Sequence, residues 1–252
     1  FLLIQYVVDR MLTIKLHTLF DVKTSIPTFL QISNAKTHDV KILDQISYEP
    51  GSFYVMDKAY IDFNRLFKLN QQQAYFVTRA KDNMRFNRMY SMPIDKTTGV
   101  KYDQIGKLES YYPSKNYPGK LRRIKYYDEE TKRELTFLTN NMDLKPLEIA
   151  YLYKKRWEVE LFFKWLKQHL KIKSFWGTTM NAVKIQMYCA IIAYCLIAII
   201  GNKLKVDRSI YEILQILSIS LLDKTPVREI LTDYDYKDVK EQLVKQLRIS
   251  GF

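Results

Sequence analysis

The most informative segment of the chain reads Tyr153-Lys-Lys-Arg-Trp-Glu-Val-Glu-Leu-Phe-Phe-Lys-Trp-Leu-Lys167. Its apolar side chains cover most of a helical circumference, which predicts one long helix over Leu147–Leu170. A polar stripe on such a helix favours a binding or catalytic face, although an ordinary surface Arg–Glu pair at this spacing would look the same. The stripe is only about 60° wide at ~100° per residue, and its members are Tyr153, Arg156, Glu160 and Lys167.

Upstream of this helix, the first third of the chain reads as β-rich. Residues 13–32 alternate around a turn and predict a hairpin. Ser52–Met56 and Ala74–Thr78 are short apolar runs, typical of strands buried on both faces of a sheet. The first of these runs leads directly into Asp57. A carboxylate there would be held rigidly at a sheet edge, within reach of a ligand or metal. The plainer alternative is an acidic residue that merely ends the strand. Short helices are predicted over Asn34–Ile46 and Ile61–Leu69.

Residues 81–133 differ from their surroundings because they are polar and rich in Tyr, Lys and Arg. Antiparallel strands are predicted here over Lys101–Tyr112 and Leu121–Tyr127, and Glu134–Thr139 returns to a core strand. From Pro146 onward the chain reads as helical. This order of elements favours a mixed sheet flanked by helices and interrupted by a β-rich insert. Further helices are predicted over Ala182–Lys203, Ile210–Leu222 and Tyr236–Arg248.

Composition narrows the range of functions. The 252 residues carry 40 Lys+Arg against 27 Asp+Glu, a net charge of +13, and 47% of them are hydrophobic. Such a chain can form a sizeable core, and its charge favours nucleic acid or a membrane surface as partner, unless the charge only serves solubility. The seven glycines form no phosphate-cradling loop, which argues against nucleotide-binding classes. The two cysteines cannot build a zinc site or a disulfide framework.

Neither a signal peptide nor a membrane span is expected. The apolar start at Phe1–Val8 has no basic leader and no cleavage site of small residues. The apolar run around Ile191–Ile200 is shorter than the ~18–20 residues that a bilayer requires, so it is expected to form a core helix.

The spacing Tyr153-x2-Arg156-x3-Glu160-x6-Lys167 resembles the Tyr-Arg-Glu-Lys signature of a large group of bacterial transposases, the "insertion sequence four" family. The resemblance extends over nearly the whole chain after about residue 13. Further segments that are similar to blocks of the family are Lys15-Leu-His-Thr18, Thr37-His-Asp39, Phe53–Phe63, Phe76-Val-Thr-Arg79 and Leu138-Thr-Asn-Asn141.

This resemblance implies a ribonuclease-H-like catalytic domain, an α/β fold in which three carboxylates (DDE) hold two Mg²⁺ or Mn²⁺ ions and cleave DNA. Asp57 matches the second Asp and Glu160 the Glu, so both are expected to be catalytic metal ligands. Tyr153, Arg156 and Lys167 are expected to contact DNA phosphates. The implied partners are the terminal inverted repeats of an insertion sequence, target DNA and a second copy in a synaptic homodimer, with no membrane. The implied location is the bacterial cytoplasm, at the nucleoid.

The family's first catalytic Asp has no obvious counterpart. Only Asp9 precedes the Lys15 block, after an apolar run but at a spacing of six residues. The chain is therefore expected to begin after that Asp or to have lost it, which would impair cleavage. Asp9 as its substitute, a catalytically dead DNA-binding remnant and a different ribonuclease-H-like nuclease are the alternatives. The expected segments are 1–80 (first part of the core, with an incomplete first strand), 81–133 (β-rich insertion), 134–205 (rest of the core) and 206–252 (C-terminal helices).

Overall fold

The computed structural model of the protein describes residues 2–9, 14–34, 38–169, 177, 179–220 and 224–233. The predicted helix Tyr236–Arg248 lies outside these residues. The chain forms two compact units, Phe1–Leu161 and Phe162–Phe252, which are taken in turn below.

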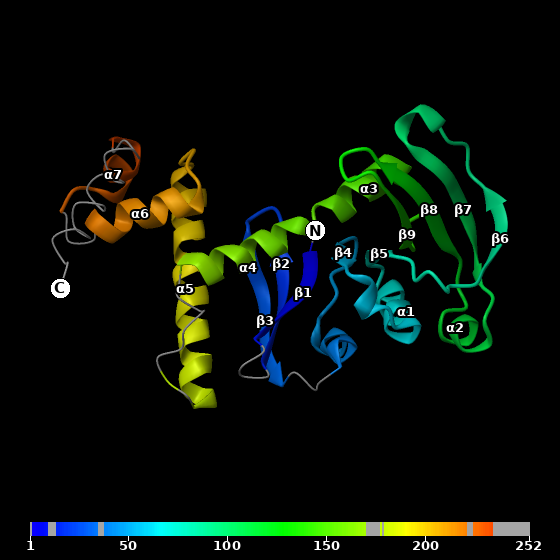
Figure 1. Ribbon diagram of the computed structural model, residues 1–252, viewed down its shortest axis with the longest axis horizontal. Helices are drawn as coiled ribbons and strands as arrows, with labels where there is room; N and C mark the ends of the chain where they lie inside the picture. Colours follow the sequence, from blue (N-terminus) through cyan, green and yellow to red (C-terminus); the bar gives the residue numbers. More distant parts are fainter. Residues whose placement is uncertain are drawn as a thin grey trace. The chain divides into compact units, whose positions relative to one another are not determined.

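The first unit is built on one nine-stranded sheet with the strand order β3-β2-β1-β4-β5-β9-β8-β7-β6 (Figure 1). β4 pairs in parallel with both β1 and β5, and every other pairing is antiparallel. The predicted α/β class, a ribonuclease-H-like mixed sheet flanked by helices, is confirmed. The strands are β1 Leu2–Asp9, β2 Ile14–Asp21, β3 Ile26–Asn34, β4 Phe53–Met56, β5 Tyr75–Arg79, β6 Phe86–Ser91, β7 Val100–Leu108, β8 Leu121–Asp128 and β9 Arg133–Thr139.

Helices cover both faces of this sheet. Side chains alternate between faces along a strand, and Leu138 of β9 belongs to the core cluster under helix α1. Its neighbour Phe137 instead packs on Tyr153 of helix α3, with ring centroids 5.1 Å apart. α1 and α3 therefore lie on opposite faces. The helices of this unit are the 3-10 turns η1 Asp39–Gln45, η2 Lys58–Tyr60 and η3 Lys96–Thr98, and the α-helices α1 Phe63–Gln71, α2 Tyr111–Asn116 and α3 Pro146–Lys154.

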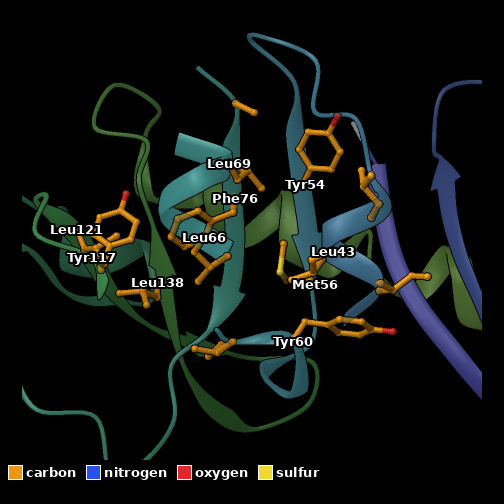
Figure 2. Close-up of a cluster of buried hydrophobic side chains, with 14 of the residues drawn as sticks. Leu43, Tyr54, Met56, Tyr60, Leu66, Leu69, Phe76, Tyr117, Leu121 and Leu138 are labelled. Atoms are coloured by element: carbon orange, nitrogen blue, oxygen red, sulfur yellow. The ribbon is translucent and has the colours of Figure 1, made fainter. Parts of the chain in front are cut away.

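Figure 2 shows the larger core cluster on the α1 face. Tyr54 and Met56 of β4 and Phe76 of β5 point into it and meet Leu66 and Leu69 of α1, all fully or almost fully buried. Tyr117, which follows α2, is also buried here, and it fixes that short helix to the sheet. Val55 and Val77 are buried as well, although they alternate with these residues. The central strands are thus covered on both faces, as their continuous apolar runs predict.

Most of the predicted elements are confirmed, but three differ. η1 is a 3-10 helix over Asp39–Gln45, shorter than the helix expected over Asn34–Ile46. The strand predicted over Lys101–Tyr112 is wrong at its end, because Tyr111 begins α2. Ser110 at the N-cap and Pro113 in the first turn are helix-start residues, and they override the alternating pattern that precedes them.

The single helix predicted over Leu147–Leu170 is also wrong. The segment forms α3 and then α4, Trp157–His169, separated by a turn at Lys155–Arg156. At this turn the Arg156 N–H donates to the Tyr153 carbonyl at 3.0 Å, and the Glu158 N–H donates to the Lys155 carbonyl at 3.0 Å. These three-residue spacings are those of a tightened 3-10 turn rather than of a continuous α-helix.

The second unit is helical, as predicted, with α5 Met180–Leu204, α6 Ile210–Ser220 and α7 Val227–Asp233. Its core joins Ile197 of α5, Ile213 and Ile216 of α6, and Ile230 and Leu231 of α7. The estimate that the apolar run of α5 is too short for a bilayer is wrong. An 18-residue window of this helix has a mean hydropathy of 2.1 and is 39% buried, so length and composition alone would allow a span.

Gly106 allows the edge strand β6 to approach β7 closely. A Cβ built at Gly106 would lie 2.1 Å from the Asn87 carbonyl oxygen and 2.7 Å from a ring carbon of Phe86. Gly106→Ala is therefore expected to push β6 away and to cost about 1–3 kcal/mol, as overpacking does. Gly119→Ala is the control, because its added methyl would meet only the Tyr117 side chain, at 3.1 Å. Hydrogen exchange of the β6 amides measures the effect. Unchanged protection in Gly106→Ala would contradict the prediction.

Candidate metal and nucleic-acid site

Asp57 stands where β4 ends in the middle of the sheet. Its Oδ1 accepts a hydrogen bond from the Ala59 N–H at 3.1 Å and caps η2. Its Oδ2 lies 3.7 Å from Nη2 of Arg79, and its side chain is 32% exposed. The sequence-based expectation of a carboxylate at this edge is confirmed in its geometry. Asp57 therefore ends the strand, as the plainer alternative has it, and its carboxylate also remains reachable from solvent.

Arg79 shares the sheet face of Asp57. β4 and β5 run in parallel with Met56 opposite Thr78, so Asp57 and Arg79 are the next residues along the two strands. Val55 and Val77 precede them by two residues and alternate with the side chains of the α1 cluster. By this alternation, Asp57 and Arg79 project to the α3 face. Sequence reasoning gave Arg79 no role of its own, because only the strand pairing places it beside Asp57.

Glu160 lies in the first turn of α4 and is held by Arg156, the residue just before that helix. Nη2 of Arg156 lies 2.6 Å from Oε1 of Glu160, and these side chains are 18% and 27% exposed. Burial alone would lower the pKa of Arg156, but Tyr153, Glu160 and the charge of Asp57 together raise it above its ordinary value. The guanidinium is thus kept in its charged form, paired with Glu160. Glu158, by contrast, pairs with Lys155 at 2.7 Å and takes no part in this group.

Tyr153 is the least accessible member of the predicted stripe. It is 8% exposed, and its ring packs between Phe137 and the guanidinium of Arg156, whose centre is 5.8 Å from the ring centroid. Its hydroxyl makes no hydrogen bond of ordinary geometry to the described residues. Burial raises the pKa of Tyr153, Arg156 and Arg79 act in the opposite direction, and Asp57 adds to the rise. The charges of three residues, Asp57, Arg79 and Arg156, therefore act on this phenol.

Lys167 lies further along α4, seven residues beyond Glu160 and exposed. At ~1.5 Å per residue this is about 10 Å along the helix axis. The structure thus groups Asp57, Glu160, Arg156 and Tyr153 by their contacts and charges. It leaves Lys167 as a solvent-facing cation on the same helix.

The register of β1 bears on the missing first carboxylate. β1 pairs in parallel with β4, with Leu3 opposite Val55 and Ile4 opposite Met56. One further step of the ladder places Gln5 level with Asp57. Asp9 is the last residue of β1, four residues beyond Gln5, which is about 13 Å at ~3.3 Å per residue. The backbone therefore sets Gln5, and not Asp9, beside Asp57.

The Leu138–Asn141 segment holds in place the strand and the loop that lead to site residues. The Asn140 side chain accepts from the Phe76 N–H at 2.8 Å and donates to Asn70 Oδ1 and the Ala74 carbonyl at 2.8 and 2.9 Å. Asn141 Oδ1 accepts from the N–H groups of Asp143 and Leu144. These bonds fix the start of β5 and the loop that leads into α3. The role of this segment in the structure is therefore to hold the scaffold together.

The donor set fits a hard divalent cation that keeps part of its hydration shell. Asp57 and Glu160 are partly exposed carboxylates, and Mg²⁺ commonly binds through one or two carboxylates, waters and substrate phosphates. Among the residues that the structure describes, no three or more His, Cys, Asp or Glu side chains cluster closely enough to hold a metal. These two carboxylates would hold such an ion, and Arg79 and Arg156 would limit the build-up of negative charge around it.

Comparison with known proteins finds a matching domain family and three similar proteins. The sequence profile of the transposase DDE domain matches residues 9–196. The chain is 37% identical over 196 residues to y4zB of Sinorhizobium fredii, a protein named as a transposase. The aligned region covers 75% of this chain and 54% of that protein. It is 30% identical over 186 residues to a Geobacillus stearothermophilus protein named for transposition of insertion sequence element IS5377, covering 73% and 48%.

A third relative, from Synechocystis, is named for insertion sequence element IS4SA and is 28% identical over 197 residues, covering 74% of this chain and 53% of that protein. The chain thus spans about half the length of these relatives.

Proposed function

We propose, from the premise that this chain belongs to the DDE transposase family, that it serves metal-dependent cleavage and strand transfer at the ends of an insertion sequence. The observations that carry the proposal are two carboxylate–guanidinium pairs, Asp57 with Arg79 and Glu160 with Arg156. Asp57 comes from the sheet, whereas Tyr153 and Glu160 come from two successive helices. The charge of Asp57 acts on both Tyr153 and Arg156, which links the two pairs.

In this proposal Asp57 and Glu160 hold Mg²⁺ or Mn²⁺. The bound ions would activate water or a 3′-hydroxyl and stabilise the leaving oxygen at a DNA phosphodiester. Arg156 keeps Glu160 in place through the 2.6 Å contact. Arg156 and the exposed Lys167 supply positive charge for DNA phosphates, and such contacts position a strand without reading its sequence. The Tyr153 hydroxyl is buried, so the part of Tyr153 in this proposal is to orient Arg156, whose guanidinium lies over its ring, rather than to contact the phosphate itself.

The polar insert provides a second region for DNA contact. The Arg123 guanidinium lies 4.6 Å from the Phe86 ring centroid and 5.3 Å from that of Tyr102. Tyr111 and Tyr112 are 72% and 75% exposed. Exposed aromatic rings suit base stacking, and cations suit contact with the backbone. The four expected segments, with 81–133 as an insertion into the core, belong to this proposal, as do a synaptic homodimer and a location at the cytoplasmic nucleoid.

We further propose that cleavage by this chain is impaired. Two-metal chemistry in the family uses three carboxylates, and no group of three or more potential metal ligands is found among the described residues. The second candidate function is therefore a DNA-binding transposase remnant that no longer cleaves. The two candidates differ in whether a residual metal-dependent activity exists and depends on Asp57 and Glu160.

The test uses the 252-residue chain and a duplex that carries the terminal repeat flanking its own coding region. We expect tighter binding to this duplex than to a scrambled one, and slow nicking at the repeat end that requires Mg²⁺ or Mn²⁺. Asp57→Asn and Glu160→Gln should retain binding and lose the nicking. Glu158→Gln is the matched control, because it removes a carboxylate from the same helix without touching the Arg156 group.

Equal binding to both duplexes would overturn the transposase proposal for this chain. End-specific binding without any nicking would favour the binding remnant. Nicking that persists in Asp57→Asn would remove Asp57 from the site.

A further inference from the structure

Two arginines interact with the charge of Asp57, and they differ in how their donors are used. Arg156 forms a 2.6 Å ion pair with Glu160. Arg79 approaches Asp57 only at 3.7 Å, which is too long for a hydrogen bond. Its Nε is buried and makes no hydrogen bond within the described part of the chain. Because the side chain is 36% exposed, the terminal Nη donors of Arg79, rather than the buried Nε, keep hydrogen-bonding capacity for an arriving substrate.

The backbone of Arg79 is held on both sides in the sheet, although its side chain is partly exposed. The residue ends β5, with β4 on one side and β9 on the other, where it pairs with Phe137. About one third of its side chain is exposed. A guanidinium on such a base offers a planar fork of five donors, which matches two phosphate oxygens at once.

We propose that the Arg79 guanidinium gives up its contact with Asp57 when DNA binds and instead binds a DNA phosphodiester next to Asp57. The proposal rests on the function proposed above. While Arg79 faces Asp57, its charge opposes a divalent cation at the same carboxylate. When a phosphate takes up the guanidinium, the carboxylate becomes a better metal ligand. Arg79 therefore couples DNA binding to metal binding, and each ligand strengthens the binding of the other.

The experiment measures the affinity for Mn²⁺, with and without the terminal-repeat duplex, by titration with electron paramagnetic resonance detection. In the wild-type chain, DNA should raise the Mn²⁺ affinity. Arg79→Gln should bind Mn²⁺ about two- to fivefold more tightly without DNA, because it removes a partly exposed ion pair of that order. The same variant should bind DNA more weakly, with a salt slope reduced by about 1, and the effect of DNA on Mn²⁺ should vanish.

Two further variants separate this role from a structural one. Arg79→Lys keeps the charge but not the fork, so it should leave the Mn²⁺ affinity without DNA near that of the wild type and still weaken DNA binding. Arg133→Gln removes the same charge from an exposed position on β9 and should change neither the Mn²⁺ affinity nor the coupling. A merely structural Arg79 would give weaker Mn²⁺ binding in both Arg79 variants.

The outcomes distinguish this inference from the proposed function. If the wild type binds DNA, and Mn²⁺ in a manner that Asp57→Asn abolishes, but Arg79→Gln leaves the coupling unchanged, the exchange is wrong and the proposed function stands. If the wild type shows no Asp57-dependent Mn²⁺ binding, the metal site itself fails.

Discussion

Arg122→Met is expected to lower the free energy of unfolding by about 3–5 kcal/mol, because it leaves the buried carboxylate of Asp103 without its counter-ion. Both side chains are almost completely buried, with exposed fractions of 3% and 1%. The pair is bidentate, with Nε–Oδ1 and Nη2–Oδ2 distances of 2.9 and 2.7 Å. Chemical denaturation of the whole chain, monitored by fluorescence and by circular dichroism, measures the loss.

The position of Arg122 gives this pair a consequence for the site. Its Nη1 donates to the carbonyls of Asn141 and Leu144, at 3.4 and 2.6 Å. These carbonyls belong to the loop that leads into α3, the helix that carries Tyr153. Loss of Arg122 should therefore also increase hydrogen exchange in α3, and not only in the strands β7 and β8.

Asp103→Leu combined with Arg122→Met provides the test of mechanism. A buried ion pair replaced by apolar side chains is often nearly neutral, so the double variant should be more stable than the sum of the single effects predicts. Lys125→Met is the matched control on β8, because its 2.6 Å pair with Glu134 is about one third to one half exposed and should contribute less than about 1 kcal/mol. A loss in Lys125→Met as large as that in Arg122→Met would refute the role of burial.

The features of the fold that the sequence predicts are those with local periodicity. The hairpin of β2 and β3, the short buried strand β4 and the helices α5 and α6 all follow from alternation or helical spacing. The break between α3 and α4 does not, because no Pro or Gly lies between Leu147 and Lys167. The interruption at Lys155–Arg156 is only two residues long, and helical spacing continues through it.

Site residues are predictable where they belong to a pattern of fixed residue types at fixed spacings, as Arg156 and Glu160 do. Arg79 and Arg122 carry no such pattern. Arg79 acquires its position from the parallel pairing of β4 and β5, and Arg122 is buried by a loop that sequence cannot place over it. Lone charged residues in polar strands are usually exposed, so their burial or convergence has to be seen in three dimensions.

Gln5→Asp is expected to raise the Mn²⁺ affinity of the chain about tenfold or more, because it adds an oxygen ligand and a negative charge, and even supporting residues around a metal are worth ~10–100-fold. Metal-dependent nicking of the terminal-repeat duplex should rise by about a hundredfold. Several kcal/mol of transition-state stabilisation come from a complete metal site, and ~1.4 kcal/mol corresponds to tenfold in rate. Residue 5 is chosen because the ladder between β1 and β4 sets it level with Asp57.

Asp9→Asn discriminates between the two accounts of the third carboxylate. Asp9 lies at the far end of β1 and pairs there with Ile14 of β2. If the register decides the geometry, Asp9→Asn leaves Mn²⁺ binding and nicking unchanged, and Gln5→Asp combined with Asp57→Asn loses the gain. If Asp9→Asn instead abolishes residual nicking while Gln5→Asp gains nothing, Asp9 is the third ligand and β1 must bend back toward β4. Because the two substitutions change one charge each on the same strand, net charge alone cannot produce that contrast.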